Sequence, residues 1–273
     1  MSIKSKIKKI LRKCKVTVNE PVYIPLLSGE LLKGKTVLVT GGTGGIGQAI
    51  ADRCIQNGAN VIITGRNQKK LSDLAEKIGA IPFVLDIQNV ADIETSFDEL
   101  IQKYKVDILI NNAGTQAGNF LGNTDEKDFD KTLSVNLKGT YFCCQVFSNY
   151  LIKNGIKGNI LNISSVSGCR PAISPYMVSK WGITGLTEGL AKKLIKYGIV
   201  VNGIAPGPVA TEMIKSDGSD LNYENAPAGR YSDPNEIANL AVFLISDMGR
   251  MIVGDTVYIT GGCGNLTFDD IKY

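Results

Sequence analysis

The run Lys35-Thr-Val-Leu-Val-Thr40 is followed at once by Gly41-Gly-Thr-Gly-Gly-Ile-Gly47. A short β-branched run that ends in a glycine cluster is typical of a buried strand. Residues 46–57 follow as a predicted helix, which Asn57-Gly58 ends. The backbone amides of such a loop, together with a helix N-terminus, can hold a pyrophosphate. The strand–loop–helix setting therefore favours nucleotide binding over a merely flexible loop.

The glycines of this loop fit two binding patterns. Gly42, Gly44 and Gly47 match G-x-G-x-x-G, whereas Gly41, Gly45 and Gly47 match T-G-x-x-x-G-x-G. In either pattern a side chain would block the close approach of phosphates. The spacing alone does not choose between the two patterns.

Strands and helices are predicted to alternate along the rest of the chain. Apolar runs predict strands at residues 35–40, 60–64, 81–85, 106–110, 159–163, 199–204 and 256–260. Helices are predicted at residues 46–57, 67–78, 89–104, 126–153, 175–197 and 234–246. Because repeated strand–helix units imply a parallel sheet with helices on both faces, we expect a single α/β domain with a Rossmann-type, doubly wound, seven-stranded sheet. Such sheets bind ligands at the carboxyl ends of their strands.

Composition excludes several classes of protein and site. The 273 residues are 44% hydrophobic and 21% charged, and no apolar run approaches the roughly 20 residues of a membrane span. The chain has no histidine, which excludes a Ser-His-Asp triad, a Cys-His pair and a histidine-ligated metal, and we expect no bound metal. The six cysteines include no C-x-x-C pair, so we interpret them as reduced thiols of a cytoplasmic protein rather than as a disulfide framework.

Positive charge is concentrated at the N-terminus. The first fifteen residues contain seven basic groups and no acidic one, so the remaining chain carries 23 basic and 26 acidic groups. This mildly acidic body argues against nucleic acid as a partner. Residues 1–15 have the pattern of a basic amphipathic helix, which could make peripheral contact with a membrane, dock on the body or a second subunit, or stay solvated. Residues 16–32 are predicted to be a linker, which gives an extension at 1–32 and a catalytic domain at 33–273.

A second ligand cue follows the second predicted strand. The sequence there is Thr64-Gly65-Arg66-Asn67, with no acidic residue. A site that prefers NAD usually has a carboxylate at this point, and a carboxylate would repel a 2′-phosphate. Arginine can instead bind such a phosphate with paired hydrogen bonds. The sequence therefore favours NADP over NAD, unless Arg66 is simply a solvated loop residue.

A third cue is Tyr176-Met-Val-Ser-Lys180, which falls in a predicted helix. Positions i and i+4 share a helix face, so the tyrosine hydroxyl and the lysine ammonium can converge on one site. A nearby cation stabilises phenolate, so we expect Lys180 to lower the tyrosine pKa. In a chain without histidine, this pair is a route to acid–base chemistry near neutral pH.

Residues 33–262 resemble the short-chain dehydrogenase/reductase family, in its short single-domain branch. The resemblance rests on several modest motifs that occur in the family's order. They are Thr40–Gly47, Asp86-Ile87, Asn111-Asn-Ala-Gly114, Asn136 within Ser134-Val-Asn-Leu137, Ser164-Ser-Val-Ser-Gly168, Tyr176-x-x-x-Lys180, Pro206-Gly-Pro-Val-Ala-Thr211 and Gly261-Gly262.

The resemblance implies a role for each matching residue. Ser165 would polarise the substrate carbonyl, Tyr176 would exchange the proton, and Lys180 would lower the tyrosine pKa and hold the nicotinamide ribose. Asn136 would position a water that links Lys180 to solvent. The segment from Ser165 to Tyr176 is shorter than in many relatives, so Ser164 and Ser167 stay alternatives to Ser165. The implied cofactor-binding residues are Gly41, Thr43, Gly45, Ile46, Gly47, Arg66, Asp86, Ile87, Asn112, Ala113, Gly114, Tyr176, Lys180, Pro206, Gly207 and Thr211.

The sequence as a whole predicts an NADP-dependent oxidoreductase that interconverts a ketone and a secondary alcohol. The pattern is more similar to 3-oxoacyl-carrier reductases and to sugar or polyol dehydrogenases than to extended sugar-nucleotide epimerases, and it leaves the small-molecule substrate unassigned. Residues 212–232 are the expected substrate lid. Relatives imply a homodimer or homotetramer in which helices 126–153 and 175–197 pair across a two-fold axis. The alternative function is a non-catalytic NADP-binding scaffold or sensor at a membrane surface.

Overall fold

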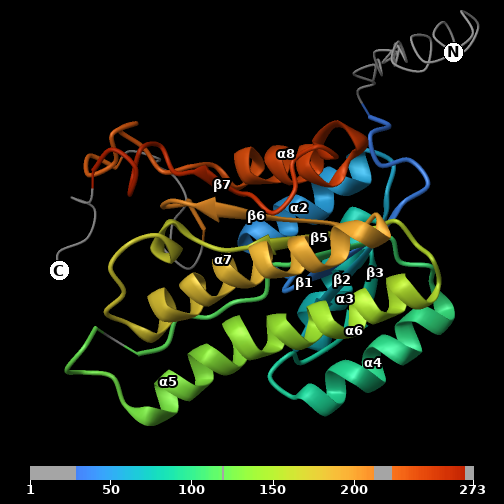
Figure 1. The fold of residues 1–273 in the computed structure, drawn as a ribbon, viewed down its shortest axis with the longest axis horizontal. Coiled ribbons are helices and arrows are strands. Elements are labelled where there is room, and N and C mark those ends of the chain that lie inside the picture. Colours follow the sequence, from blue (N-terminus) through green and yellow to red (C-terminus); the bar gives the residue numbers. More distant parts are fainter. Residues whose placement is uncertain (1–28, 119, 212–222, 268–273) are drawn as a thin grey trace, which may run out of the picture.

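A parallel seven-stranded sheet forms the centre of the computed structural model, which describes residues 29–118, 120–211 and 223–267. The strand order is β3-β2-β1-β4-β5-β6-β7. The strands are β1 (Thr36–Thr40), β2 (Asn60–Gly65), β3 (Ile81–Val84), β4 (Ile108–Asn111), β5 (Asn159–Ile163), β6 (Val200–Pro206) and β7 (Thr256–Ile259). Helices lie on both sides of the sheet (Figure 1). The predicted Rossmann-type, doubly wound fold is therefore confirmed.

The helices connect these strands close to where the sequence placed them, with ends that shift by up to three residues. They are α2 (Gly45–Gln56), α3 (Gln68–Ile78), α4 (Val90–Lys103), α5 (Glu126–Leu133), α6 (Thr140–Lys153), α7 (Pro175–Leu194) and α8 (Pro234–Ile245). Short turns of 3₁₀-helix, η2 (Val166–Gly168), η3 (Ile195–Tyr197) and η4 (Asp247–Gly249), were not predicted as separate elements. Capping explains several helix starts, because the side chains of Asn67, Asn89, Asp125, Ser174 and Asp233 accept hydrogen bonds from backbone amides of the first turns.

One predicted helix is more complex than the sequence indicated. The expected helix at 126–153 consists of α5 and α6 joined by a π-helical segment, η1 (Ser134–Gly139). Local π-helical turns are rare and occur frequently at functional sites. The buried Asn136 lies within this segment, so the irregular backbone coincides with a predicted site residue.

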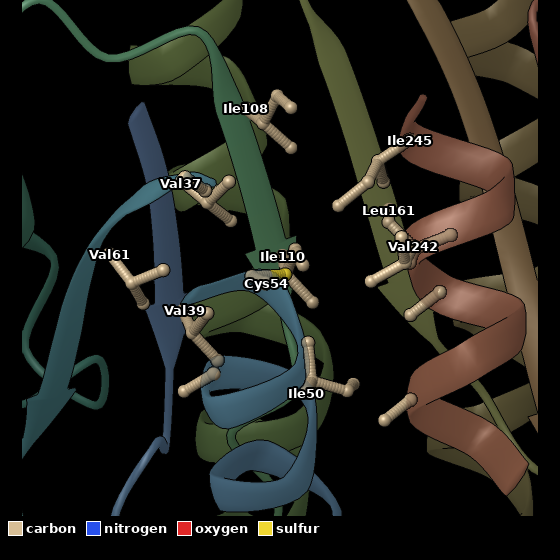
Figure 2. Close-up of a cluster of buried hydrophobic side chains, with 14 of the residues drawn as sticks. Val37, Val39, Ile50, Cys54, Val61, Ile108, Ile110, Leu161, Val242 and Ile245 are labelled. Carbon is tan, nitrogen blue, oxygen red and sulfur yellow. The ribbon is translucent and has the colours of Figure 1, made fainter. Parts of the chain in front are cut away.

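Two apolar cores pack against opposite faces of the sheet. Val37 and Val39 of β1 belong to the core formed with α2, α3 and α8, whereas Leu38 between them belongs to the core formed with α4, α6 and α7. Figure 2 shows the first core, in which Ile50 of α2 and Val242 of α8 lie beside the strands. Because successive strand side chains point to opposite faces, one apolar strand supplies both cores, which is why these strands lack polar alternation.

The packed core begins slightly before the predicted domain boundary. Leu32 is only 1% exposed, belongs to the α2–α8 core, and donates its amide to the carbonyl of Asn57 at 2.9 Å. It therefore packs with the domain although the sequence assigned it to the linker. Residues 1–28 lie outside the described residues, so the amphipathic helix and its membrane contact stay predictions. Among the residues that are described, no helix has the length and apolar character needed to cross a membrane.

Three of the buried cysteines are unsuited to nucleophilic chemistry. Cys54, Cys143 and Cys144 are free thiols in the two cores. Burial raises the pKa of Cys54 to about 12 and that of Cys144 to about 12, and it also raises the pKa of Cys143. Since the thiolate is the reactive form, these three side chains act as apolar core residues.

Candidate active site

A cavity of about 430 Å³ lies along the carboxyl edge of the sheet, where its walls follow the ends of β1 to β6. Strands β1 and β4 are neighbours in this sheet although they are not consecutive in the chain, so their connections leave in different directions and a crevice remains between them. The cavity therefore occupies the position at which doubly wound sheets bind their ligands.

Most of the predicted site residues line this one cavity. They are Gly41, Thr43, Gly45, Ile46, Arg66, Asp86, Ile87, Asn112, Ala113, Gly114, Ser165, Tyr176, Lys180, Pro206, Gly207 and Thr211. Two other predicted residues, Gly47 and Asn136, do not line it and are buried instead. They contribute by holding the walls in place.

The glycine loop follows the second of the two patterns in the sequence. Gly41 and Gly45 have φ values of 65° and 54°, in the left-handed region that favours glycine, whereas Gly44 does not. A Cβ at Gly41 would lie 2.7 Å from the Cα of Ala113, and a Cβ at Gly45 would lie 3.3 Å from Thr211. Side chains at these two positions would thus fill the space at the start of α2. Backbone amides and the helix dipole favour a bound phosphate there. These residues fit a dinucleotide.

A hydrogen-bond network connects this loop to the end of β4. The Thr40 hydroxyl accepts the amides of Asn112 and Ala113 at 3.1 and 3.2 Å. The side-chain amide of Asn112 donates to the carbonyls of Thr40 and Gly41 at 3.1 and 2.9 Å. These hydrogen bonds pair backbone groups that are costly to leave unpaired. They also set the width of the crevice.

Asn136 holds the next residues of the same wall. Its carbonyl oxygen accepts the amide of Thr115 at 2.8 Å, and its side-chain amide donates to the carbonyl of Thr115 at 2.9 Å and to the hydroxyl of Ser179 at 3.1 Å. The side chain thereby joins η1 to the loop after β4 and to α7. Its contacts position the loop that lines the cavity.

Ser165, Tyr176 and Lys180 converge at one end of the cavity. The Ser165 hydroxyl lies beside the phenol of Tyr176 and acts to lower its pKa, and the ammonium of Lys180 lies 5.6 Å from the centre of the tyrosine ring. The same ammonium donates to the carbonyl of Ile163 at 2.8 Å, which connects α7 to the end of β5. The i, i+4 spacing in α7 brings the tyrosine and the lysine together as the sequence predicted.

The other two serines have structural contacts. Ser164 is buried and shares hydrogen bonds with the carbonyl of Lys180 and the hydroxyl of Thr184, at 3.1 and 3.0 Å. Ser167 is buried, and its amide donates to the hydroxyl of Ser165. Of the three serines, Ser165 is the one whose side chain affects the pKa of Tyr176, so the structure favours Ser165 over both alternatives.

The expected pKa shift of Tyr176 is wrong in direction. Burial raises the pKa of Tyr176 above its usual value of 10.0, and the neighbouring Ser165 hydroxyl only partly opposes this effect. Burial also lowers the pKa of Lys180 from 10.5 to about 8, because an ammonium is poorly solvated in the cleft. The spacing along the sequence predicted that the tyrosine hydroxyl and the lysine ammonium meet. It did not predict the loss of water around the two groups, which has the larger effect on their pKa values.

The sequence analysis missed several polar residues of the cavity. Lys70, Gln88 and Lys131 all line it, and a Cβ at Gly44 would lie 3.7 Å from the Lys70 ammonium. Lys70 lies in the first turn of α3, only four residues after Arg66, so the two cations lie along the same part of the wall. The charge spacing of Arg66 and Lys70 was the signal that could have revealed this pair.

Known proteins share this fold. The family model for short chain dehydrogenases matches residues 35–222. The chain belongs to the short-chain dehydrogenase/reductase family. As a member of that family it is an NAD(P)-dependent oxidoreductase.

Curated and solved members of the family match most of the chain. The chain is 34% identical to the 3-oxoacyl-[acyl-carrier-protein] reductase of Rickettsia conorii, over 85% of this chain and 97% of that protein. It is 32% identical, over 85% and 97% of the two chains, to a (2S)-[(R)-hydroxy(phenyl)methyl]succinyl-CoA dehydrogenase subunit of Thauera aromatica. A crystal structure of a short-chain type dehydrogenase/reductase from Mycobacterium marinum has a TM-score of 0.81 at 26% identity, with 86% and 97% coverage.

The buried ammonium of Lys180 predicts a specific pH dependence of stability. The folded pKa of about 8 lies below the ordinary 10.5, so between these values the folded protein has released a proton that the unfolded chain retains. The stability contributed by Lys180 therefore rises with pH across this window. We expect the free energy of unfolding of the wild type, relative to Lys180→Met, to increase by about 2 kcal/mol from pH 8 to pH 10.5.

Denaturant unfolding of the cofactor-free protein at each pH measures this difference. Lys192→Met is the matched control, because Lys192 is exposed on the same helix, and it should keep the wild-type pH dependence. Parallel pH profiles for the wild type and Lys180→Met would contradict the prediction.

Proposed function

We propose that the chain is an NADP-dependent oxidoreductase that interconverts a ketone and a secondary alcohol. The observation that carries the proposal is the placement of Ser165 and Tyr176 beside the buried Lys180, in the same cavity as the glycine loop. A phenol and a hydroxyl that point at one place can both bond a carbonyl oxygen, and a buried cation stabilises negative charge that develops there. When the cofactor is bound, its nicotinamide supplies or accepts the hydride.

The residues of the chain move and stabilise the proton. In the reductive direction Ser165 donates a hydrogen bond to the substrate carbonyl and polarises it. Tyr176 then transfers its phenolic proton to the carbonyl oxygen as the new C–H bond forms, and oxidation reverses both changes. The raised pKa of Tyr176 keeps it protonated at neutral pH, which suits a proton donor. Lys180, fixed by the carbonyl of Ile163, favours the phenolate that remains and can hold ribose hydroxyls.

Asn136 acts in this set as a positioning residue. Its side chain holds Thr115 on both sides, and Thr115 lines the cavity. Its hydrogen bond to Ser179 also holds η1 against α7, the helix that carries Tyr176 and Lys180. The water that the family resemblance assigned to Asn136 stays a prediction.

Replacement of the phenol separates an oxidoreductase from a non-catalytic binding protein. Tyr176→Phe keeps the ring but removes the proton donor, so we expect turnover of ketones to fall by a factor of about 10² to 10⁴ while cofactor affinity is retained. Steady-state assays with NADPH and fluorescence titration of the cofactor give the two readouts. Tyr197→Phe, in the η3 turn after α7, is the matched control and should keep full activity. Cofactor binding without turnover in the wild type would instead favour the scaffold function.

The preference for NADP is supported by the charges in the part of the cavity wall that follows β2. No acidic residue follows directly after β2, whereas Arg66 and Lys70 both line the wall there. Two cations can bind a 2′-phosphate, and the carboxylate that would repel it is lacking at this position. We propose that Arg66 and Lys70 together hold the 2′-phosphate.

Arg66→Ala tests the cofactor choice. Since hydrogen bonds to charged groups contribute about 1.5–3 kcal/mol each, we expect NADPH affinity to fall roughly 10- to 100-fold while NADH affinity changes little. Fluorescence titrations with both cofactors measure this difference. Lys77→Ala, in the last turn of α3, controls for the general loss of positive charge. Equal weakening of both cofactors, or tighter NADH binding by the wild type, would show that Arg66 does not select NADP.

We also propose that two copies of the chain associate through the face formed by α5, η1, α6 and α7. An apolar groove of about 530 Å³ on this face is lined by Leu133, Leu137, Tyr141, Phe142 and Leu186, among others. Large exposed apolar groups lie on the same helices, at Phe129, Tyr141, Val178 and Trp181. Contiguous apolar patches of this kind mark association surfaces, and homo-oligomers generally use two-fold symmetry.

Two charges placed on this face should break the assembly. Tyr141→Asp combined with Val178→Asp puts carboxylates where the copies would meet, so we expect a shift from dimer or tetramer toward the 29.3 kDa monomer in light scattering. Met251→Asp is the control, because Met251 is more accessible than either residue but lies beyond α8. A monomeric wild type, or an unchanged mass of the double variant, would rule out this interface.

A further inference from the structure

Exposed lysines follow one another along the amino edge of the sheet, where its parallel strands begin. The neighbouring strands β1, β4, β5 and β6 each have an exposed lysine in the connection that leads into them. The amide of Asp107 donates to Thr36, and that of Asn159 to Asp107, at 3.0 and 3.1 Å. A Cβ at Gly198 would lie 3.0 Å from the side chain of Lys157, so the connections before β5 and β6 are also in contact. Because neighbouring strands lie about 4.8 Å apart, these residues form one row, the amino-edge lysines, which are Lys35, Lys105, Lys157 and Lys196.

The charge of this row is not neutralised within the domain. The amino-edge lysines form no ion pair with any residue that the structure describes. Glu30 and Asp247, at the same edge, form ion pairs with other cations at 2.7 and 3.0 Å. Asp107 accepts the amide of Thr36 at 2.9 Å, and Asp255 precedes β7, outside the row. The row therefore keeps positive charge that a partner could neutralise.

The ends of two helices add further lysines to this edge. Lys153 lies in the last turn of α6, and Lys192 and Lys193 lie in the last turn of α7. Basic residues at such positions also compensate the negative ends of the helix dipoles. The amino-edge lysines lie outside the α-helices, so this stabilisation does not account for them.

The opposite, carboxyl edge has a different composition. Its described connections contain no lysine, because the lysines of the cavity, Lys70, Lys131 and Lys180, belong to helices. These connections are residues 41–44, 66–67, 85–89, 112–118, 120–125, 164–174, 207–211, 223–233 and 260–267. The exposed lysines of the connections are therefore concentrated at the edge that lies away from the cavity.

Exposed apolar side chains lie at the same edge as the lysines. Ile195 and Tyr197 flank Lys196 and are 43% and 42% exposed. The ammonium of Lys196 lies 5.0 Å from the centre of the Tyr197 ring. Met251, in the connection that leads into β7, is 93% exposed. Cations combined with exposed apolar and aromatic groups are typical of surfaces that lie among lipid headgroups.

The basic N-terminal segment joins the domain at this edge. The amide of Leu32 donates to the carbonyl of Asn57, in the connection that leads into β2. In Figure 1 the first described residues lie on the right of the view, as do the C-terminal ends of α4, α6 and α7. Residues 1–15 contain seven basic groups and no acidic one. These groups are therefore attached to the edge that already carries the lysine row.

We propose that the amino edge of the sheet is a peripheral docking surface for an anionic membrane. Acidic lipid headgroups neutralise the amino-edge lysines and the N-terminal segment, while Ile195, Tyr197 and Met251 contact the headgroup region. A nucleic acid could neutralise the same charges but would leave these apolar groups without a partner. Since the cavity lies at the opposite edge, a docked molecule keeps it open to solution. This inference goes beyond the proposed function and does not depend on it.

Co-sedimentation with vesicles tests the docking surface. The full chain should bind vesicles of phosphatidylcholine and phosphatidylglycerol, mixed in about a 2:1 ratio, at least about tenfold more tightly than pure phosphatidylcholine, because each lysine near an anionic surface contributes about fivefold in affinity. Salt at about 0.5 M should weaken this binding by at least about tenfold, since it screens the charges. NADPH should bind equally well to the free and the vesicle-bound protein.

Paired variants of the full chain locate the surface on the folded domain. Lys105→Glu combined with Lys157→Glu leaves the N-terminal segment unchanged, so a fall of at least about tenfold in affinity for the anionic vesicles measures the sheet edge. Lys69→Glu combined with Lys127→Glu is the matched control, because it makes the same change of charge in the first turns of α3 and α5, at the carboxyl edge. The control should stay within about threefold of wild type, because its charges lie beyond the screening length. Thermal unfolding of both variants verifies that they fold.

Every other outcome overturns the proposal. Equal binding to neutral and anionic vesicles, or binding to neither, excludes an electrostatic membrane surface. Anionic binding that Lys105→Glu with Lys157→Glu does not weaken assigns the contact to the N-terminal segment alone. Duplex DNA that binds where vesicles do not identifies nucleic acid as the partner. Loss of NADPH binding on vesicles contradicts the orientation. None of these readouts requires turnover, so failure of the oxidoreductase proposal is detected separately.

Discussion

The contact between the ends of β1 and β4 is the constraint on which the site depends. The Thr40 hydroxyl and the Asn112 amide join these two strands where their connections leave in different directions. Gly41 can approach Ala113 closely because it has no side chain, so the loop stays open toward the cavity. The crevice is therefore a consequence of topology, and a few hydrogen bonds and one glycine set its width.

The end of the cavity that holds Tyr176 and Lys180 is shielded from water. This desolvation has opposite consequences for stability and for chemistry. The ammonium of Lys180 is buried and bonded to the carbonyl of Ile163, which holds α7 on β5 but lowers the lysine pKa to about 8. The same loss of water raises the pKa of Tyr176. Burial thus makes the charged forms of Tyr176 and Lys180 unfavourable in the cofactor-free site, although it also holds both side chains in place. Such destabilisation is common in preformed active sites.

The sequence analysis failed where the outcome depended on surroundings rather than on spacing. The pattern of residues 126–153 predicts one helix, because apolar periodicity cannot reveal the π-helical turn around Asn136. Lys70 was missed because its place in the cavity depends on how α3 packs beside the glycine loop. Leu32 was assigned to a linker on the basis of the prolines before it, although its side chain fits between elements that lie far along the chain.

The sequence by itself determined the alternation of strands and helices, the position of the glycine loop, the i, i+4 pairing of Tyr176 with Lys180 and hence the family. These are local properties, because a strand, a helix or a loop is recorded in neighbouring residues. Only the tertiary structure decided which glycines need a left-handed backbone, which serine affects Tyr176, and in which direction burial shifts the pKa values. These outcomes depend on water excluded and atoms contributed by distant segments, and spacing along the chain carries no record of either.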